Sequence, residues 1–101
     1  MWYNDRMEYS DLGGIRSSRL VLGCMRIADK PLADVERLLD AALELGVNTL
    51  DNADIYGGGT CESMIGDALK APSLRDKFVL QTKCGICGGK YDLSRKHIIE
   101  S

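Results

Sequence analysis

The chain has 101 residues, of which 45% are hydrophobic and 28% charged, and its net charge is −2. This length suffices for one small domain. Proteins that bind nucleic acid or an anionic membrane surface usually carry an excess of basic residues, and this chain does not, so we expect neither partner.

The first twelve residues, MWYNDRMEYSDL, contain no apolar core of the kind that a signal peptide needs. No apolar run approaches the length of a membrane span. We therefore expect a cytoplasmic protein, in which the four cysteines are thiols. Residues 1–6 are expected to be disordered.

The first predicted element is a hairpin within residues 7–23. Two short extended pieces flank Gly13 and Gly14, and glycine tolerates the positive φ that a tight turn requires. The second piece ends in residues 20–22, which are uniformly apolar before Gly23. A strand that is apolar on both faces is typical of a covered, parallel sheet.

A helix is predicted next, within residues 31–46. One face is apolar, because hydrophobic residues recur at helical spacing: Val35, Leu38, Leu39, Ala42 and Leu45. Pro31 suits the first helical turn, and Gly46 suits the position just past the last turn.

Two further strand and helix pairs follow. A short strand at residues 47–50 leads through an acidic stretch and three glycines into a helix at residues 61–71, with Thr60 as its predicted N-cap. Residues 78–83 form a third strand. The glycines at 88 and 89 are interpreted as a flexible lead into a last helix, which Ser94 caps.

The order of elements indicates the fold class. Strands that alternate with helices predict an α/β protein with a parallel sheet and right-handed crossovers. Three strands and an unfinished third helix do not close a structure, and the third strand would leave an open edge. We therefore interpret residues 1–101 as the N-terminal part of a single, longer barrel domain, since a (β/α)8 barrel takes roughly 250 residues.

Three polar residues follow the predicted strands. Asp51 and Tyr56 come after the second strand, and Lys83 ends the third. The C-terminal ends of barrel strands form one mouth, where active sites lie. An ammonium beside a phenol favours loss of the phenolic proton, and a carboxylate would keep that ammonium charged. The three residues could thus act as a general acid for carbonyl reduction. Alternatively, Asp51 only caps a turn and Lys83 extends to solvent.

A resemblance to a known family rests on several segments. The stretch TLDNADIYGGGTCESMIGDAL resembles the aldo/keto reductase signature. Upstream, LGGIRSSRLVLGCMRI is similar to the N-terminal hairpin, first strand and cofactor loop of that family. Downstream, VLQTKCGI and YDLSRKHIIES are similar to the strand that carries its lysine and to the next helix. The similarity is greatest to a bacterial branch described only as oxidoreductases.

The resemblance implies a (β/α)8 barrel that binds NADP(H) and transfers hydride to an aldehyde or ketone. By position, Tyr56 would donate the proton, Lys83 would assist it, and Asp51 would support the lysine. The residues that would lie against the cofactor are Gly23, Cys24, Met25, Arg26 and Asp51. The family's catalytic histidine follows a fourth strand. His97 does not match that position and is interpreted as a helix-surface residue, so the 101 residues alone should be inactive.

Two motifs allow a rival interpretation. The segment YGGGTCE fails the dinucleotide-binding fingerprint, because its third glycine position is Glu62. The pair Cys84 and Cys87 could mark a zinc or redox site, but the other two cysteines are isolated in sequence. We expect no metal, with Cys84 a packing neighbour of the lysine and Cys87 a loop residue.

Two alternative functions stay open at this point. One is a nicotinamide-binding regulatory subunit of the same superfamily without catalysis. The other is a stand-alone remnant that only oligomerises. A histidine after a fourth strand would favour catalysis, and a cooperative thermal transition of the isolated chain would favour a stand-alone protein. The identity of the substrate is not indicated by these residues.

Overall fold

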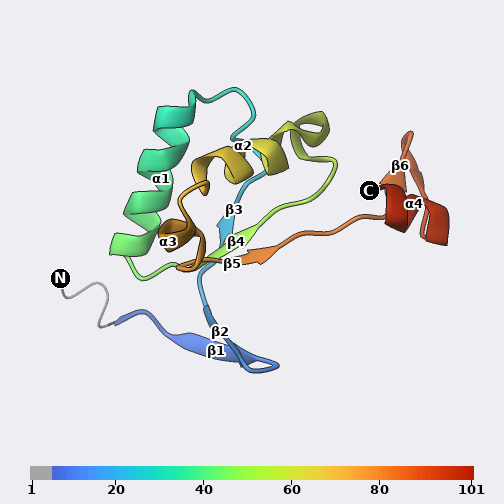
Figure 1. The fold of residues 1–101 in the computed structure, drawn as a ribbon. Coiled ribbons are helices and arrows are strands. Elements are labelled where there is room, and N and C mark those ends of the chain that lie inside the picture. Colours follow the sequence, from blue (N-terminus) through green and yellow to red (C-terminus); the bar gives the residue numbers. More distant parts are fainter. Residues whose placement is uncertain (1–5) are drawn as a thin grey trace.

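The structure, a computed structural model, describes residues 6–101 (Figure 1). The predicted disorder of residues 1–6 therefore falls almost wholly outside the described residues. The strands are β1 (Tyr9–Leu12), β2 (Ile15–Ser18), β3 (Leu22–Gly23), β4 (Thr49–Asp51), β5 (Val79–Gln81), β6 (Ile86–Cys87) and β7 (Lys90–Tyr91). The helices are α1 (Leu32–Glu44), the 3-10 helix η2 (Tyr56–Gly59), α2 (Thr60–Ala68), α3 (Pro72–Arg75) and α4 (Arg95–Glu100). Within the described chain, no helix combines the length and apolar character that a membrane span requires.

The centre of the fold is a three-stranded parallel sheet in the order β3-β4-β5. Helices α1 and α2 lie together on one side of it, as Figure 1 shows. This arrangement confirms the predicted α/β class and the hairpin followed by three βα units. The sheet does not close among the described residues, so the structure is an open portion of a barrel.

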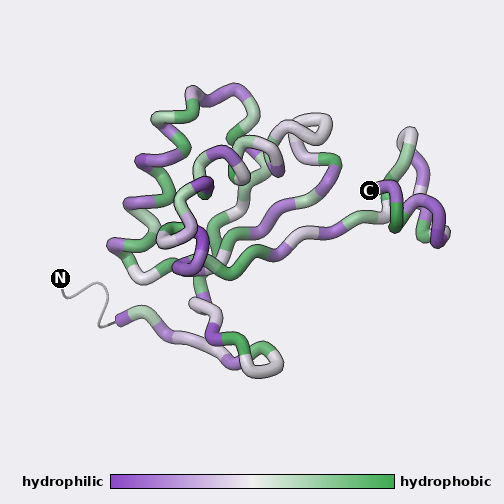
Figure 2. The backbone as a smooth tube through the Cα atoms, in the orientation of Figure 1, coloured by the Kyte–Doolittle hydropathy of each residue, from purple (hydrophilic) through white to green (hydrophobic). Residues whose placement is uncertain are grey.

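The hydrophobic core lies between α1, α2 and the sheet. Val35 and Leu39 of α1 are fully buried, as are Leu50 of β4 and Cys61 of α2. Burying a side chain such as Leu39 stabilises the fold by about 1.5–3 kcal/mol. The packing of a few such side chains therefore stabilises α1 more than its intrinsic helix propensity does. In Figure 2 hydrophobic and hydrophilic residues alternate along α1, which fits a helix with one covered face.

The N-terminal hairpin is joined to the start of β4 by buried polar contacts. The hydroxyls of Ser17 and Thr49 lie 2.7 Å apart, and both residues are buried. The backbone N–H of Ser18 donates to the side-chain oxygen of Asn48 at 2.7 Å. Because buried polar groups need partners, these bonds fix the hairpin against β4 and cover the entry end of the sheet.

The predicted turn and cap positions are mostly confirmed. Gly13 and Gly14 turn the hairpin with φ of 61° and 91°, and Gly46 takes φ of 83° after α1. Ser94 caps α4, because its hydroxyl accepts the backbone N–H of His97 at 3.1 Å. The N-cap prediction for Thr60 is wrong: Gly59 holds that position with φ of 98°.

Thr60 is the first residue of α2, and its hydroxyl donates to the carbonyl of Gly57 at 2.7 Å. The three glycines before it adopt positive φ and curl the chain tightly, which carries Thr60 past the cap position. The run of glycine therefore sets the start of α2 more strongly than the capping preference of threonine does.

Two short elements were not predicted. Helix α3 begins at Pro72, and a hairpin of β6 and β7 occupies residues 86–91. Gly88 and Gly89 form its turn with φ of 58° and 76°, so their interpretation as a flexible lead is wrong, as is that of Cys87 as a loop residue. Strands of two residues are too short to show an alternating pattern, although a Gly-Gly turn is typical of such hairpins.

Gly57 and Gly58 provide a matched test of how the chain reaches α2. Both have positive φ, at which an alanine costs about 1–2 kcal/mol. A Cβ at Gly57 would lie 2.7 Å from Cβ of Ala28, whereas one at Gly58 would meet nothing within 4 Å. We predict that Gly57→Ala lowers the free energy of unfolding by about 1–3 kcal/mol more than Gly58→Ala does. Urea denaturation of both variants measures this, and equal losses would contradict the described packing.

Candidate active site

The parallel register places a carboxylate and an ammonium on neighbouring strands. Asp51 ends β4 and stands opposite Gln81 of β5, and Lys83 follows two residues later on the same side of that chain. The Lys83 ammonium donates to Asp51 Oδ1 at 2.9 Å and to the backbone carbonyl of Asn52 at 2.7 Å. Both side chains remain partly open to solvent. The lysine is thus bonded on one side and accessible on the other.

Tyr56 lies over this lysine. It begins η2, five residues after β4 ends, and packs partly against the core. The Lys83 ammonium is 4.9 Å from the centre of the Tyr56 ring, within the range of a cation–π contact. The structure therefore brings together the three residues that the sequence singled out, Asp51, Tyr56 and Lys83.

Electrostatics keep the ion pair charged over a wide pH range. The hydrogen bond from Lys83 lowers the pKa of Asp51 below its ordinary 3.8, and the bond from Gln81 adds to this. The same contact with Asp51, and then the oxygen of Tyr56, raise the pKa of Lys83 above its ordinary 10.5. The stabilisation from Asp51 is complete above 3.8 and is lost as the pH falls through its folded pKa. That from Lys83 is complete below 10.5 and is lost as the pH rises through its folded pKa.

Gln81 is a site residue that the sequence reasoning missed. Its amide donates to Asp51 Oδ1 at 2.8 Å, so the amide and the Lys83 ammonium share one carboxylate oxygen. Residues two apart on a strand face the same side, which groups Gln81 with Lys83, but only the register between β4 and β5 brings that side to Asp51. Gln81 thus orients the carboxylate that orients the lysine.

The residues of the predicted cofactor loop differ in exposure: the Cys24 side chain is buried, whereas Gly23, Met25 and Arg26 are exposed. Gly23 stands in register with Asp51, and a Cβ there would meet nothing within 4 Å, which leaves open space beside the carboxylate. The Cys24 side chain is buried in the core, and burial raises the pKa of its thiol to about 11. Only the backbone of Cys24 therefore faces this region; its N–H donates to the carbonyl of Asp51 at 2.9 Å. Met25 and Arg26 are exposed on the loop that follows.

A pocket of about 470 Å³ opens next to the ammonium. Tyr56, Lys83 and Cys84 line one part of it, and the rest is lined mainly by apolar side chains: Ile55, Ile86, Tyr91 and Leu93. Cys84 is exposed and lies beside Lys83 in the lining of this pocket. A larger hollow of about 720 Å³ near Met7 contains none of the candidate site residues. The smaller pocket is therefore the one relevant to chemistry.

His97 does not lie on the helix surface as predicted. Its side chain is only 13% exposed, and its Nε2 is 4.0 Å from Oδ2 of Asp54. The C-terminal residues of the described chain fold back toward the loop after β4, where the Ser101 hydroxyl also donates to Asp54. Helical spacing alone did not indicate this contact, because it depends on the unpredicted β6–β7 hairpin.

Comparison with known proteins decides the family. The family model described as "Aldo/keto reductase family" matches residues 19–101. The chain belongs to the aldo/keto reductase family. Among its relatives, it is 47% identical over 87 residues to a 6-dehydroglucose reductase from Agrobacterium fabrum, a match that covers 79% of this chain and 29% of that protein. It is 40% identical over 99 residues to the oxidoreductase YdhF of Escherichia coli, covering 87% and 33%.

Solved aldo/keto reductases share the fold. The holo form of an aldo-keto reductase from Bacillus halodurans superposes with a TM-score of 0.75 at 36% identity. The match covers 94% of this chain and 34% of that barrel. The chain therefore spans about a third of the length of the relatives that it matches. The curated relatives carry the names of a reductase and an oxidoreductase.

The coupling of Asp51 to Lys83 is directly testable. We predict that Lys83→Met raises the pKa of the Asp51 carboxyl toward its ordinary 3.8, because the largest cause of its depression is removed. Carboxyl ¹³C chemical shifts followed during an acid titration measure this pKa. Lys70→Met is the matched control, since Lys70 pairs with Asp67 on the surface at 3.4 Å. An Asp51 pKa that is unchanged by Lys83→Met would show that the ion pair is absent.

Proposed function

We propose that this protein is an NADP(H)-dependent reductase of aldehydes or ketones, with Tyr56 as the proton donor. The observation that carries the proposal is the Lys83 ammonium, held by Asp51 at 2.9 Å and placed 4.9 Å from the Tyr56 ring centre. Carbonyl reduction requires a proton for the oxygen that becomes an alkoxide, and a phenol next to a fixed cation can supply it.

Each residue has a definable part in this chemistry. The pocket bordered by Tyr56 and Lys83 would hold the carbonyl group. The ammonium stabilises the phenolate that forms when Tyr56 gives up its proton, and Asp51 with Gln81 keeps the ammonium in place. The exposed cation also stabilises negative charge on the carbonyl oxygen as that charge develops.

The residues present fit a nicotinamide cofactor. The missing side chain at Gly23 leaves space next to Asp51 at the same strand ends, with Met25 and Arg26 on the adjoining loop. When bound, the cofactor supplies the hydride that the carbonyl carbon accepts. NADP(H) is the cofactor we propose, as the resemblance to the family implies, and the cytoplasm remains the expected location.

The substrate is proposed only as a class. One relative is named for reduction of 6-dehydroglucose, which fits a reductase of carbonyl compounds. The alternative of a regulatory subunit without catalysis receives less support, because the curated relatives carry the names of enzymes. The family's catalytic histidine would come from a fourth strand beyond these residues, so the activity is proposed for the complete polypeptide.

Tyr56→Phe in the complete polypeptide tests the proton donor. We predict a fall in kcat for aldehyde reduction of about 10²–10⁴-fold, since the variant loses its general acid while keeping the ring over Lys83. Binding of NADPH, followed by its fluorescence, should stay nearly unchanged. Tyr91→Phe is the matched control, because Tyr91 lines the same pocket from β7. Reduction by Tyr56→Phe at the parent rate would remove Tyr56 from the mechanism.

A further inference from the structure

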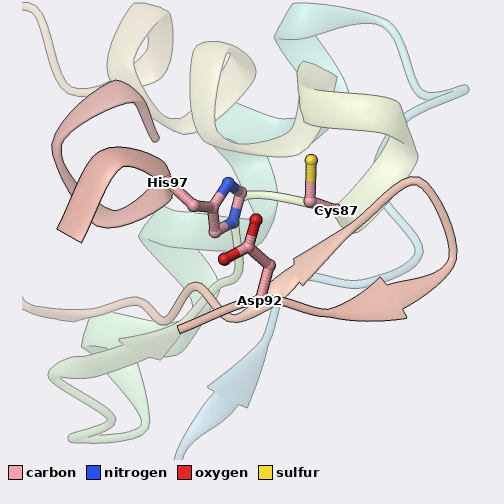
Figure 3. A group of neighbouring side chains, drawn as sticks. All are labelled: Cys87, Asp92 and His97. Carbon is pink, nitrogen blue, oxygen red and sulfur yellow. The ribbon is translucent and has the colours of Figure 1, made fainter. Parts of the chain in front are cut away.

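Three side chains that could bind a metal ion gather beside the pocket. Cys87 belongs to β6, Asp92 follows β7, and His97 lies on α4. One donor atom from each lies within 4.8 Å of the other two. Figure 3 shows the three side chains clustered where the hairpin meets the helix. Cys87 is one of the two cysteines of the Cys84–Cys87 pair, and the proposed reduction makes no use of it.

The local fold explains why these residues meet. The Gly88–Gly89 turn folds β7 back on β6, so that Cys87 pairs with Lys90 and the chain returns toward Cys87 before Asp92. Asp92 then accepts the backbone N–H of Ser94 at 2.9 Å, which starts α4 at a fixed place. This bond is made by Oδ1 of the carboxylate. His97 lies within the first turn of α4, so the helix carries its ring toward the hairpin.

The imidazole of His97 provides an independent indication. Its Nε2 is buried, and among the described residues it has no hydrogen-bond partner. A buried polar nitrogen without a partner is unfavourable, so such an atom calls for a ligand or a donor-acceptor contact. The nearest carboxylate, that of Asp54, lies at 4.0 Å. That separation is too long for a hydrogen bond, so this nitrogen stays available to a ligand.

We propose that Cys87, Asp92 and His97 bind one divalent metal ion, for which Zn²⁺ is best suited. A thiolate, an imidazole and a carboxylate form a ligand set that favours zinc over calcium or magnesium, which take oxygen ligands. In a tetrahedral zinc site, donor atoms lie roughly 3.3–3.8 Å apart. The donor atoms of Cys87, Asp92 and His97, within 4.8 Å of one another, are close to these separations, and Cys87 is exposed. Water would complete the coordination.

Such an ion would tie the hairpin to α4 beside the active site. Ile86 and Tyr91 of the hairpin and Leu93 after it line the pocket next to Lys83. Fixing the two elements together would hold this wall of the pocket in place. The proposed role is structural, and it does not depend on the proposed reduction.

Titration of the metal-free, untagged complete protein with Co²⁺ tests the site. Tetrahedral Co²⁺ gives intense visible bands, and a bound thiolate adds a near-ultraviolet charge-transfer band. We expect both bands at one equivalent of Co²⁺, with displacement by Zn²⁺. We expect Cys87→Ser to lose the charge-transfer band, and His97→Gln to weaken Co²⁺ binding at least tenfold.

Cys84→Ser is the matched control, because Cys84 is also exposed and lies three residues away. It should keep both bands. Circular dichroism of each variant confirms that the fold is retained. The proposal is overturned if the parent protein shows no visible band, or if Cys84→Ser removes the charge-transfer band while Cys87→Ser keeps it.

Discussion

The hydrogen-bonded ion pair between Asp51 and Lys83 crosses from β4 to β5 at the point where both strands end. Its 2.9 Å contact depends on the parallel register of the two strands, because a shift of one residue would turn the lysine to the opposite face of the sheet. The pair positions the Lys83 ammonium, which is the only cation over the Tyr56 ring among the residues that the structure describes. The chemistry proposed for this site therefore depends on strand register.

Strand β4, which carries Asp51, is held by contacts on both of its faces. The hairpin docks on the start of β4 through buried polar contacts between Ser17 and Thr49. The covered face of the same strand packs Leu50 against α1 and α2. Since Thr49 and Asp51 share one face and Leu50 occupies the other, polar and apolar contacts constrain the strand together. The stability of the sheet and the geometry of the site thus have common causes.

Much of this organisation could be predicted from sequence. The helix carrying Val35 and Leu39 has a clear period, and the position of Lys83 at a strand end follows from an apolar run. The resemblance to aldo/keto reductases supplied the roles of Asp51 and Tyr56 and the family membership, which the family model confirms over residues 19–101. The catalytic roles themselves remain predictions.

The features that were missed share a physical reason. The β6–β7 hairpin consists of two-residue strands, so it shows no periodicity, and the burial of His97 depends on that hairpin. The contact of Gln81 with Asp51 depends on the register between two strands, which one strand's sequence does not specify. The side chain of Cys24 lies in the core because alternation on β3 continues into the loop. In each case the burial or the contact of the side chain depends on tertiary structure, which the local sequence pattern does not specify.

A double-mutant cycle between Asp51 and Lys83 tests the central claim most directly. The quantity measured is kcat for carbonyl reduction by the complete polypeptide at saturating cofactor, for Asp51→Asn, Lys83→Met and the double variant. If Asp51 acts by holding the lysine, the double variant loses no more activity than Lys83→Met does alone. If the two losses multiply in the double variant, the residues act independently, and the ion pair is not the basis of the site.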